Sequence, residues 1–372
     1  MHNEAMQDHK LPSAIYLCNS PRHLFLSVAE SMARGGRDTI FYLADHAPLR
    51  PELITALKSL HPTAEFITDT DQALQREFTN LPQGLPGILK RNLRLHARHL
   101  FQTARGWRLP TLSSRKYDIA YLYHSGFFAA KPISALADFV VLRESGLNNY
   151  HARSVAANKA LIRAIFGLSP FAQVWGEERW VDRIEVAHPE RLPSQVAAKG
   201  AAHSTLDHFK NLAPEKLEDL AKAFIPNGAT FAPTRTTPTA LLLSQPLSEV
   251  GICTSRQKAA IYDEITQTLR SRGYEVHLKP HPLEVDFVTP VETIIPSEIP
   301  LEVWHGLNTP TYDIVVACRS FALAETSYHI AKKSIQLVSE HRFNARAFQT
   351  WQPSMRETLE VALDEVSSCE RN

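Results

Sequence analysis

Short apolar runs alternate with helical patterns along the first part of the chain. The run at 14–19 ends in a turn-like Asn19-Ser20-Pro21 and is followed by a helical pattern over 23–33. Gly35-Gly36 closes that pattern before a second apolar run at 39–43, so the chain opens as strand, helix, strand. The alternation returns at 119–122, 139–142 and 152–166. It predicts a parallel sheet covered by helices on both faces.

A second block of the same kind follows a break. The stretch 226–238 is rich in Pro, Thr and Gly and poor in large apolar residues, which is typical of a linker. Apolar runs, a helical pattern and a closing glycine follow at 240–244, 255–272, Gly273, 274–278 and 314–317. The sequence therefore predicts an α/β protein with two doubly wound domains.

The predicted boundaries divide the chain into five parts. They are a polar leader at 1–12, an N-terminal domain at 13–232, a linker at 233–239, a C-terminal domain at 240–350 and a final helix at 351–372, with packing back onto the N-terminal domain as one option for that helix.

Composition removes several classes of protein. The chain has 372 residues, of which 44% are hydrophobic, and 40 Lys and Arg face 39 Asp and Glu for a net charge of +1. Near neutrality argues against a surface built throughout to bind nucleic acid. Four separated cysteines without a C-x-x-C pair argue against a disulfide framework or a zinc site; they are Cys18, Cys253, Cys318 and Cys369.

Two further patterns bear on location. No apolar run is long enough to span a bilayer, and the first ten residues lack the apolar core of a signal peptide, so we expect a cytoplasmic protein. One segment departs from neutrality, because no acidic residue occurs between Glu77 and Asp118. Its basic residues, among them Lys90, Arg91, Arg94 and Arg98, are interleaved with apolar ones.

Polar residues follow the predicted strands at the ends where α/β folds bind ligands. They are Arg143-Glu144-Ser145-Gly146, the stretch 244–249, Lys279-Pro280-His281-Pro282 and Cys318-Arg319-Ser320. A carboxylate followed by a glycine suits a general base that an acceptor hydroxyl must approach. The alternative is that Glu144 is a solvated turn residue or an ion-pair partner of Arg143.

His281 stands between two prolines, which hold the backbone rigid on either side. Such presentation suits a histidine that donates to a phosphate or protonates a leaving group. Ser320 fits either a phosphate site at a helix N-terminus or an ordinary N-cap. Glu302 fits either a first-turn acid or a carboxylate that accepts from a ribose.

Together these residues resemble the bacterial sialyltransferase and polysialyltransferase group of GT-B glycosyltransferases. The resemblance extends from about Ala14 to Glu325 and rests on short motifs. They are Leu17-Cys18-Asn19-Ser20-Pro21-Arg22-His23-Leu24, Ser244-Gln245-Pro246-Leu247-Ser248-Glu249, Lys279-Pro280-His281-Pro282, Ile299-Pro300-Leu301-Glu302 and the Ser320 helix entry. It implies two Rossmann-like domains facing each other across a cleft, with the acceptor on the N-terminal side.

The resemblance also implies a role for each position. His281 would bind the phosphate of a CMP-activated sugar and act as general acid, Ser320 would add a phosphate contact, and Glu302 would hold the ribose. Glu144 would be the base, with Glu249 as a rival. The remaining donor-binding positions would be Lys279, Pro282, Gln245, Asn19 and Ser20. Two departures stand out: Ser145 replaces the second acid of the family's acidic motif, and Arg319 precedes Ser320 where Ser-Ser is frequent.

The expected reaction is an inverting transfer of a sialic acid, or a related nonulosonic acid, from CMP to a glycan of the cell surface. A lipooligosaccharide, O-antigen or capsule is the expected acceptor. We expect no cofactor and no metal, since a histidine, a hydroxyl and a helix N-terminus can stabilise the leaving phosphate. Asp69-Thr70-Asp71 is a formal D-x-D but is expected to cap a helix, and His96 and His99 share a helical turn without a third ligand.

Three alternatives remain open from the sequence. One is a donor of another kind, such as CMP-Kdo, another CMP-nonulosonic acid or a CDP-polyol. The second is a nucleic-acid-binding protein that uses the basic segment 90–116. The third concerns that same segment in the enzyme, where it would face an anionic acceptor or the inner leaflet of the membrane.

Overall fold

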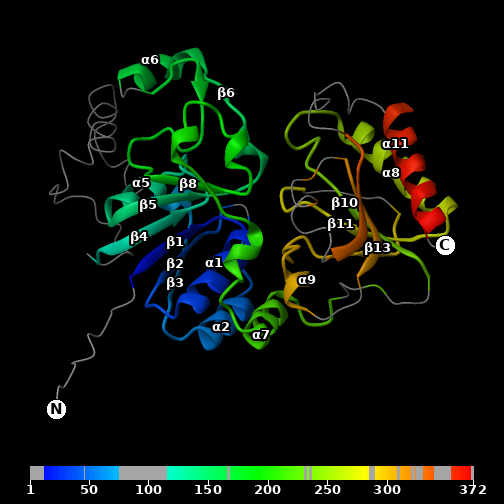
Figure 1. Cartoon of the computed structure of the whole chain (residues 1–372), viewed down its shortest axis with the longest axis horizontal. Helices are drawn as coiled ribbons and strands as arrows, with labels where there is room; N and C mark the ends of the chain where they lie inside the picture. Colours follow the sequence, from blue (N-terminus) through cyan, green and yellow to red (C-terminus); the bar gives the residue numbers. More distant parts are fainter. Residues whose placement is uncertain are drawn as a thin grey trace. The chain divides into compact units, whose positions relative to one another are not determined.

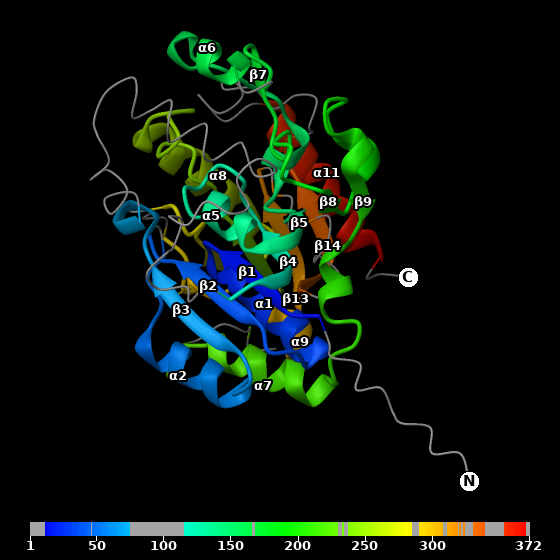
Figure 2. The same cartoon turned by 90° about the vertical axis from the view of Figure 1, so that its left-hand side faces the viewer.

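The structure is a computed structural model that describes residues 12–45, 47–74, 115–165, 168–229, 233, 237–284, 290–307, 311–318, 320, 323, 330–338 and 353–369. The chain separates into two compact units, Met1–Ala213 and Pro214–Asn372. Figures 1 and 2 show that each unit is built around its own sheet. No helix among the described residues is both long enough and apolar enough to cross a membrane.

The first unit contains a seven-stranded parallel sheet in the order β3-β2-β1-β4-β5-β8-β9. Its strands are β1 (Ala14–Cys18), β2 (Thr39–Leu43), β3 (Glu65–Asp69), β4 (Tyr117–Leu122), β5 (Ala137–Arg143), β8 (Arg183–Val186) and β9 (Gly200–Ala202). A separate antiparallel pair joins β6 (Arg153–Ser154) to β7 (Ala172–Gln173). Its helices are α1 (Pro21–Arg34), α2 (Pro51–Leu60), α5 (Ala130–Ala135) and α6 (Ala157–Ile165), with short 3-10 turns η1 (Leu147–Tyr150), η2 (Pro189–Arg191), η3 (Ala197–Lys199) and η4 (Thr205–His208).

Local sequence explains where α1 begins and ends. Ser20 is its N-cap and accepts from the His23 N–H at 3.2 Å, and Pro21 occupies the first turn, where a missing N–H carries no penalty. Gly35 ends it in the left-handed conformation at φ 69°. The predicted helix at 23–33 is therefore present and slightly longer.

The second unit contains a five-stranded parallel sheet in the order β12-β11-β10-β13-β14. Its strands are β10 (Thr239–Leu243), β11 (Glu275–Lys279), β12 (Thr293–Ile294), β13 (Tyr312–Ala317) and β14 (Ala331–Gln336). Its helices are α7 (Pro214–Phe224), α8 (Ser255–Ser271), α9 (Val303–Gly306) and α11 (Pro353–Cys369). The central strands β10 and β13 are buried almost throughout, as expected for a parallel sheet covered on both faces.

Two features of the domain organisation differ from the sequence prediction. The division falls before α7 and not at 233–239, because α7 packs on α9: a Cβ placed on Gly306 would lie 2.8 Å from the Leu217 carbonyl oxygen. The final helix packs within the second unit, because Met355, Leu359 and Leu363 belong to the core of that unit. Figure 1 shows α11 on the same face of this sheet as α8, where Arg272 and Asp364 form an ion pair at 2.5 Å.

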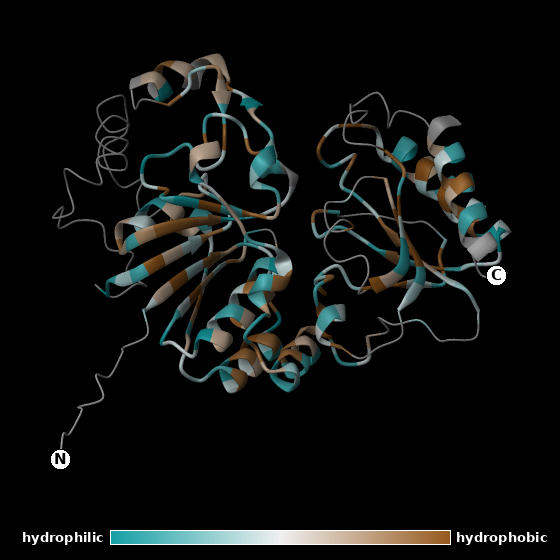
Figure 3. Cartoon of the chain, viewed as in Figure 1, coloured by the Kyte–Doolittle hydropathy of each residue, from teal (hydrophilic) through white to brown (hydrophobic). Residues whose placement is uncertain are grey.

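Both sheets reverse strand order at their centre. In the first unit the reversal lies between β1 and β4, and in the second between β10 and β13. Apolar colour predominates in the central part of each sheet in Figure 3. Ligands of doubly wound folds bind at the carboxyl ends of strands beside such a switch point.

Candidate active site

Glu144 lies directly after β5, at the carboxyl end of the first sheet. Its side chain is buried, and its Oε2 accepts the backbone N–H of Ala187 at 2.7 Å. Ala187 follows β8, the neighbouring strand. A hydrogen bond donated to a carboxylate favours its ionised form, which is the form a general base requires.

The loop after Glu144 explains why a glycine follows. Gly146 has φ 127° and ψ −159°, a region that is essentially restricted to glycine. Asn149, itself buried, accepts from the Ser145 N–H at 3.0 Å and lies 3.3 Å from the Ser145 Oγ. Ser145, which departs from the family's acidic motif, therefore stabilises this turn.

Arg143 does not pair with Glu144, as one interpretation of the sequence had it. Its NH2 group lies 2.7 Å from Glu30 Oε1 and its Nε lies 3.1 Å from Glu185 Oε2. The guanidinium also stacks over the Tyr121 ring at 4.5 Å. Arg143 thus fixes the end of β5, whereas the Ala187 N–H holds the Glu144 side chain.

Asn19 and Ser20 lie directly after β1, beside the switch point of the first sheet. Asn19 Oδ1 is 2.7 Å from His23 Nδ1, and Ser20 is the N-cap of α1. Arg22 donates to the Glu144 carbonyl oxygen at 3.3 Å and to Thr205 Oγ1 at 3.1 Å. Asn19 and Ser20 therefore belong to the unit that contains Glu144, and the other expected donor-binding residues belong to the second unit.

His281 follows β11 in the second unit, and the hydrogen bonds around it define which nitrogen carries the proton. Its Nδ1 accepts the Leu283 N–H at 3.1 Å, so the neutral ring carries its proton on Nε2. Burial, together with the charges of Lys279 and Lys258, lowers the pKa of His281 to about 4. The ring is therefore a neutral Nε2–H donor at physiological pH.

A buried ion network supports the backbone at His281. Glu284 Oε2 accepts from the His281 N–H and from Ser244 Oγ, both at 2.5 Å, and its Oε1 lies 2.5 Å from Lys258 Nζ. Lys258 is 2% exposed. Sequence reasoning missed both Lys258 and Glu284. A signal for Lys258 was available, because it occupies the apolar face of α8 together with Ile261, Tyr262, Ile265 and Leu269.

Glu249, the rival base, belongs to this same network. Both of its carboxylate oxygens lie 3.0 Å from Lys258 Nζ. Burial works against ionisation, but the bonds to Lys258 and Ser248 outweigh it and lower the pKa of Glu249. A carboxylate held in an ion pair is a weaker proton acceptor.

Lys279 and Glu302 are both buried in the second unit. Lys279 Nζ donates to the Ser297 carbonyl oxygen at 2.9 Å. Burial lowers the pKa of Lys279 to about 7, although Glu298, Glu302 and Glu284 act in the opposite direction. Glu302 directly precedes α9 and makes no capping bond through its side chain.

The remaining sequence candidates lie at the same sheet edge or outside the described residues. The Gln245 N–H donates to the Tyr262 hydroxyl at 2.9 Å directly after β10, Pro282 is exposed, and Ser320 is partly buried three residues after β13. The helix that Ser320 was expected to open lies outside the described residues, as do His96, His99, Lys90, Arg91, Arg94 and Arg98.

The D-x-D stretch serves backbone structure, although not quite as predicted. Thr70 Oγ1, and not an aspartate, accepts from the Ala73 N–H at 3.1 Å. Asp71 accepts from the Phe128 and Ala129 N–H groups at 3.2 and 2.9 Å. Asp71 therefore binds the turn that leads into α5.

Comparison with known proteins identifies the class and the family of this chain. The chain is a glycosyltransferase. It belongs to the alpha-2,8-polysialyltransferase family, whose sequence model matches residues 119–339, more than half of the chain. The matched region contains Glu144, His281, Glu302 and Ser320. No curated protein matches the chain as a sequence relative.

Two solved plant structures are similar to this chain. One is Arabidopsis thaliana UGT89C1 complexed with UDP, with 11% identity and a TM-score of 0.42 over 95% of this chain and 90% of that chain. The other is Glycyrrhiza uralensis UGT73P12 complexed with glycyrrhetinic acid 3-O-monoglucuronide, with 12% identity and a TM-score of 0.46 over 94% of this chain and 79% of that chain.

Proposed function

We propose that this glycosyltransferase moves a sialic acid, or a related nonulosonic acid, from its CMP-activated donor to a hydroxyl of a cell-surface glycan. The proposal rests on the state of His281. Its ring is a neutral Nε2–H donor, and a rigid turn at a strand end holds it in place. Membership of the polysialyltransferase family supports the sugar class.

The proposed step is a single displacement. The Glu144 carboxylate takes the proton of the acceptor hydroxyl, whose oxygen bonds to the anomeric carbon as the bond from that carbon to the CMP phosphate oxygen breaks. Both electrons of the broken bond stay on the phosphate, and attack from the opposite face inverts the configuration. The Ala187 N–H donates to Glu144 Oε2 and so orients the carboxylate for this task.

His281 acts on the other side of the reaction. Its Nε2–H donates to the phosphate oxygen that gains charge, and the approaching anion raises the affinity of the ring for a second proton. Glu302 is assigned to the donor ribose, and Ser320, Lys279, Pro282 and Gln245 are assigned to the donor. Asn19 and Ser20 are also assigned to donor binding. No step requires a metal ion or a cofactor.

The decisive experiment is incubation with CMP-sialic acid and a panel of acceptor glycans, followed by mass spectrometry of the products. We expect transfer by the wild type, with or without EDTA. Loss by about two to four orders of magnitude is expected for Glu144→Gln and for His281→Ala, the range that general acid and base groups contribute. Glu218→Gln, which changes an exposed ion pair with Lys222, is the matched control. Wild-type turnover by either site variant, or dependence on added Mn²⁺ or Mg²⁺, contradicts the mechanism.

The donor is tested separately because the phosphate site does not identify the sugar. We expect CMP and CDP to raise the midpoint of thermal unfolding more than UMP and UDP do, since binding stabilises the folded state. Stabilisation by UDP without stabilisation by CMP contradicts a cytidine donor. If CMP binds but CMP-sialic acid gives no product, CMP-Kdo, other CMP-nonulosonic acids and CDP-polyols are the donors to assay next.

The basic segment that includes Lys90, Arg91, Arg94 and Arg98 is proposed to face an anionic acceptor or the inner leaflet of the cytoplasmic membrane. Flotation with anionic vesicles tests the membrane role. Equal recovery of the protein with neutral and anionic vesicles contradicts it. Binding to generic DNA with a steep salt dependence would instead favour the nucleic-acid alternative.

A further inference from the structure

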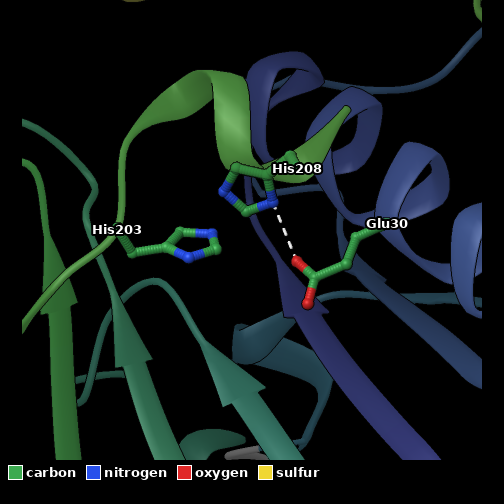
Figure 4. A group of neighbouring side chains, drawn as sticks. All are labelled: Glu30, His203 and His208. Atoms are coloured by element: carbon green, nitrogen blue, oxygen red, sulfur yellow. Dashed lines mark hydrogen bonds and ion pairs between the residues drawn. The ribbon is translucent and has the colours of Figure 1, made fainter. Parts of the chain in front are cut away.

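Three side chains that are distant in sequence converge beside the first sheet. Glu30 comes from the middle of α1, His203 follows β9, and His208 ends η4. One potential ligand atom from each lies within 4.8 Å of the other two. Figure 4 shows both rings directed towards the Glu30 carboxylate, with His208 Nδ1 2.8 Å from Glu30 Oε2.

One atom of this cluster is buried without a hydrogen bond. His203 Nε2 is enclosed and has no hydrogen-bond partner in the described part of the chain. The His203 ring stands edge-on to the His208 ring, with centroids 4.6 Å apart. Buried polar atoms are almost always satisfied, so an enclosed imidazole nitrogen beside a second imidazole and a carboxylate indicates a missing ligand.

The residue types of the cluster suit a cation. Two imidazole rings and one carboxylate offer nitrogen and oxygen ligands within reach of one another. Metal ions bind such groups when the imidazoles are neutral and the carboxylate is ionised.

Among the residues that the structure describes, Arg143 is the one Lys or Arg in direct contact with Glu30, and two carboxylates balance its charge. It contacts Glu30 Oε1 at 2.7 Å and Glu185 Oε2 at 3.1 Å, so two carboxylates face one guanidinium. Its bond to Oε1 leaves Oε2 directed at the histidines and holds the carboxylate in place. A ligating carboxylate is commonly oriented by such an outer hydrogen bond.

We propose that Glu30, His203 and His208 form a binding site for Zn²⁺. Two imidazole nitrogens and one carboxylate oxygen favour Zn²⁺ over Mg²⁺ or Ca²⁺, which prefer sites made only of oxygens. The ion takes the place of the proton that His208 Nδ1 shares with Glu30, and His208 then carries its ring proton on Nε2. A water molecule completes the coordination at the fourth position.

The ion would connect α1 to the segment 203–208. Arg22 already joins the same two parts, because it bonds to Thr205 and to the carbonyl oxygen of Glu144. Zn²⁺ would therefore stabilise the contacts that hold the backbone at Glu144, the candidate base. It takes no part in the proposed transfer step, so the protein without zinc keeps its activity below its unfolding temperature.

The test is a binding experiment on chelator-treated full-length protein without a histidine tag. We expect about one Zn²⁺ per chain in competition with a chromophoric chelator, and a rise in the midpoint of thermal unfolding on adding Zn²⁺. His203→Ala should weaken Zn²⁺ binding at least tenfold and abolish the thermal rise, because it removes a ligand and leaves the Glu30 bonds to His208 and Arg143 intact. His188→Ala, which removes a partly exposed histidine paired with Glu190, is the control.

Cobalt substitution gives a second readout that does not depend on stability. Co²⁺ should give visible absorption bands typical of low coordination number in the wild type and the control, and lose them in His203→Ala. Circular dichroism confirms that each variant is folded, and His203→Gln replaces the alanine variant if that one is not. Equal Zn²⁺ affinity in His203→Ala and the control, or no binding by the wild type at micromolar Zn²⁺, overturns the proposal. Neither result bears on sialyl transfer.

Discussion

Single residues in this protein owe their chemical state to neighbours that are remote in sequence. The prolines beside His281 are visible in the chain, but its neutral Nε2–H form follows from the Leu283 N–H, from burial and from two lysines. Glu144 likewise follows a strand as predicted, whereas the Ala187 N–H that holds it comes from a loop 43 residues away. The position of each group was predictable, and the contacts that hold it were not.

The lowered pKa of His281 predicts a dependence of stability on pH. The folded-state pKa of about 4 lies below the ordinary value of 6.5, so between these values the unfolded chain binds the proton and the native chain does not. His281 therefore makes the free energy of unfolding fall as the pH drops from about 6.5 to about 4. Denaturant titrations across this range should give a shallower dependence for His281→Gln than for the wild type. Identical slopes would show that His281 keeps an ordinary pKa in the folded protein.

The packing of helices and turns in this protein depends in part on buried charged residues, which do not fit the apolar pattern that predicts a helix. Lys258 interrupts the apolar face of α8 and joins it to the turn after β11 through Glu284. A pattern of apolar positions predicted the helix well, but it gave no reason for a lysine at a core position. Its partner Glu284 follows β11, and β11 lies beside β10 only in the folded sheet.

We predict that Lys258→Met is strongly destabilising although methionine fits an apolar face. Removing one member of a buried ion pair leaves the other charges unpaired, which costs about 3–5 kcal/mol. Glu284 would then hold the His281 N–H less rigidly, so the apparent affinity for CMP should fall as well. Chemical denaturation and CMP titration measure the two effects. The double variant Lys258→Met with Glu284→Gln is the control and should recover part of the lost stability, because it removes one of the unpaired charges.

At the scale of the whole molecule, the boundary between the units was harder to predict than the units themselves. The Pro-rich stretch 226–238 reads as a linker, yet α7 precedes it and belongs to the second unit. Leu217, Leu220, Ala221 and Phe224 are buried on α7, and α7 packs on α9. Loop composition predicts where a chain is irregular, and packing decides which unit a helix belongs to.

This difference predicts how truncated chains behave. A chain of residues 214–372 should unfold cooperatively and at a higher temperature than one of residues 233–372. The shorter chain loses the apolar contacts of α7, each large side chain of which contributes roughly 1.5–3 kcal/mol when buried. Differential scanning calorimetry measures both transitions. Equal midpoints would mean that α7 adds nothing to the second unit and that the boundary lies at the Pro-rich stretch.

The sequence by itself determined the two alternating α/β blocks, the strand ends and the rigid turn at His281, because periodicity, glycines and prolines act over a few residues. Only the tertiary structure decided that Glu30, His203 and His208 meet, that Arg143 pairs with Glu30 and Glu185, and that Lys258 and Glu284 support His281. Those contacts join residues that lie far apart along the chain. They depend on strand order and crossover, which local patterns of hydrophobicity and charge do not encode.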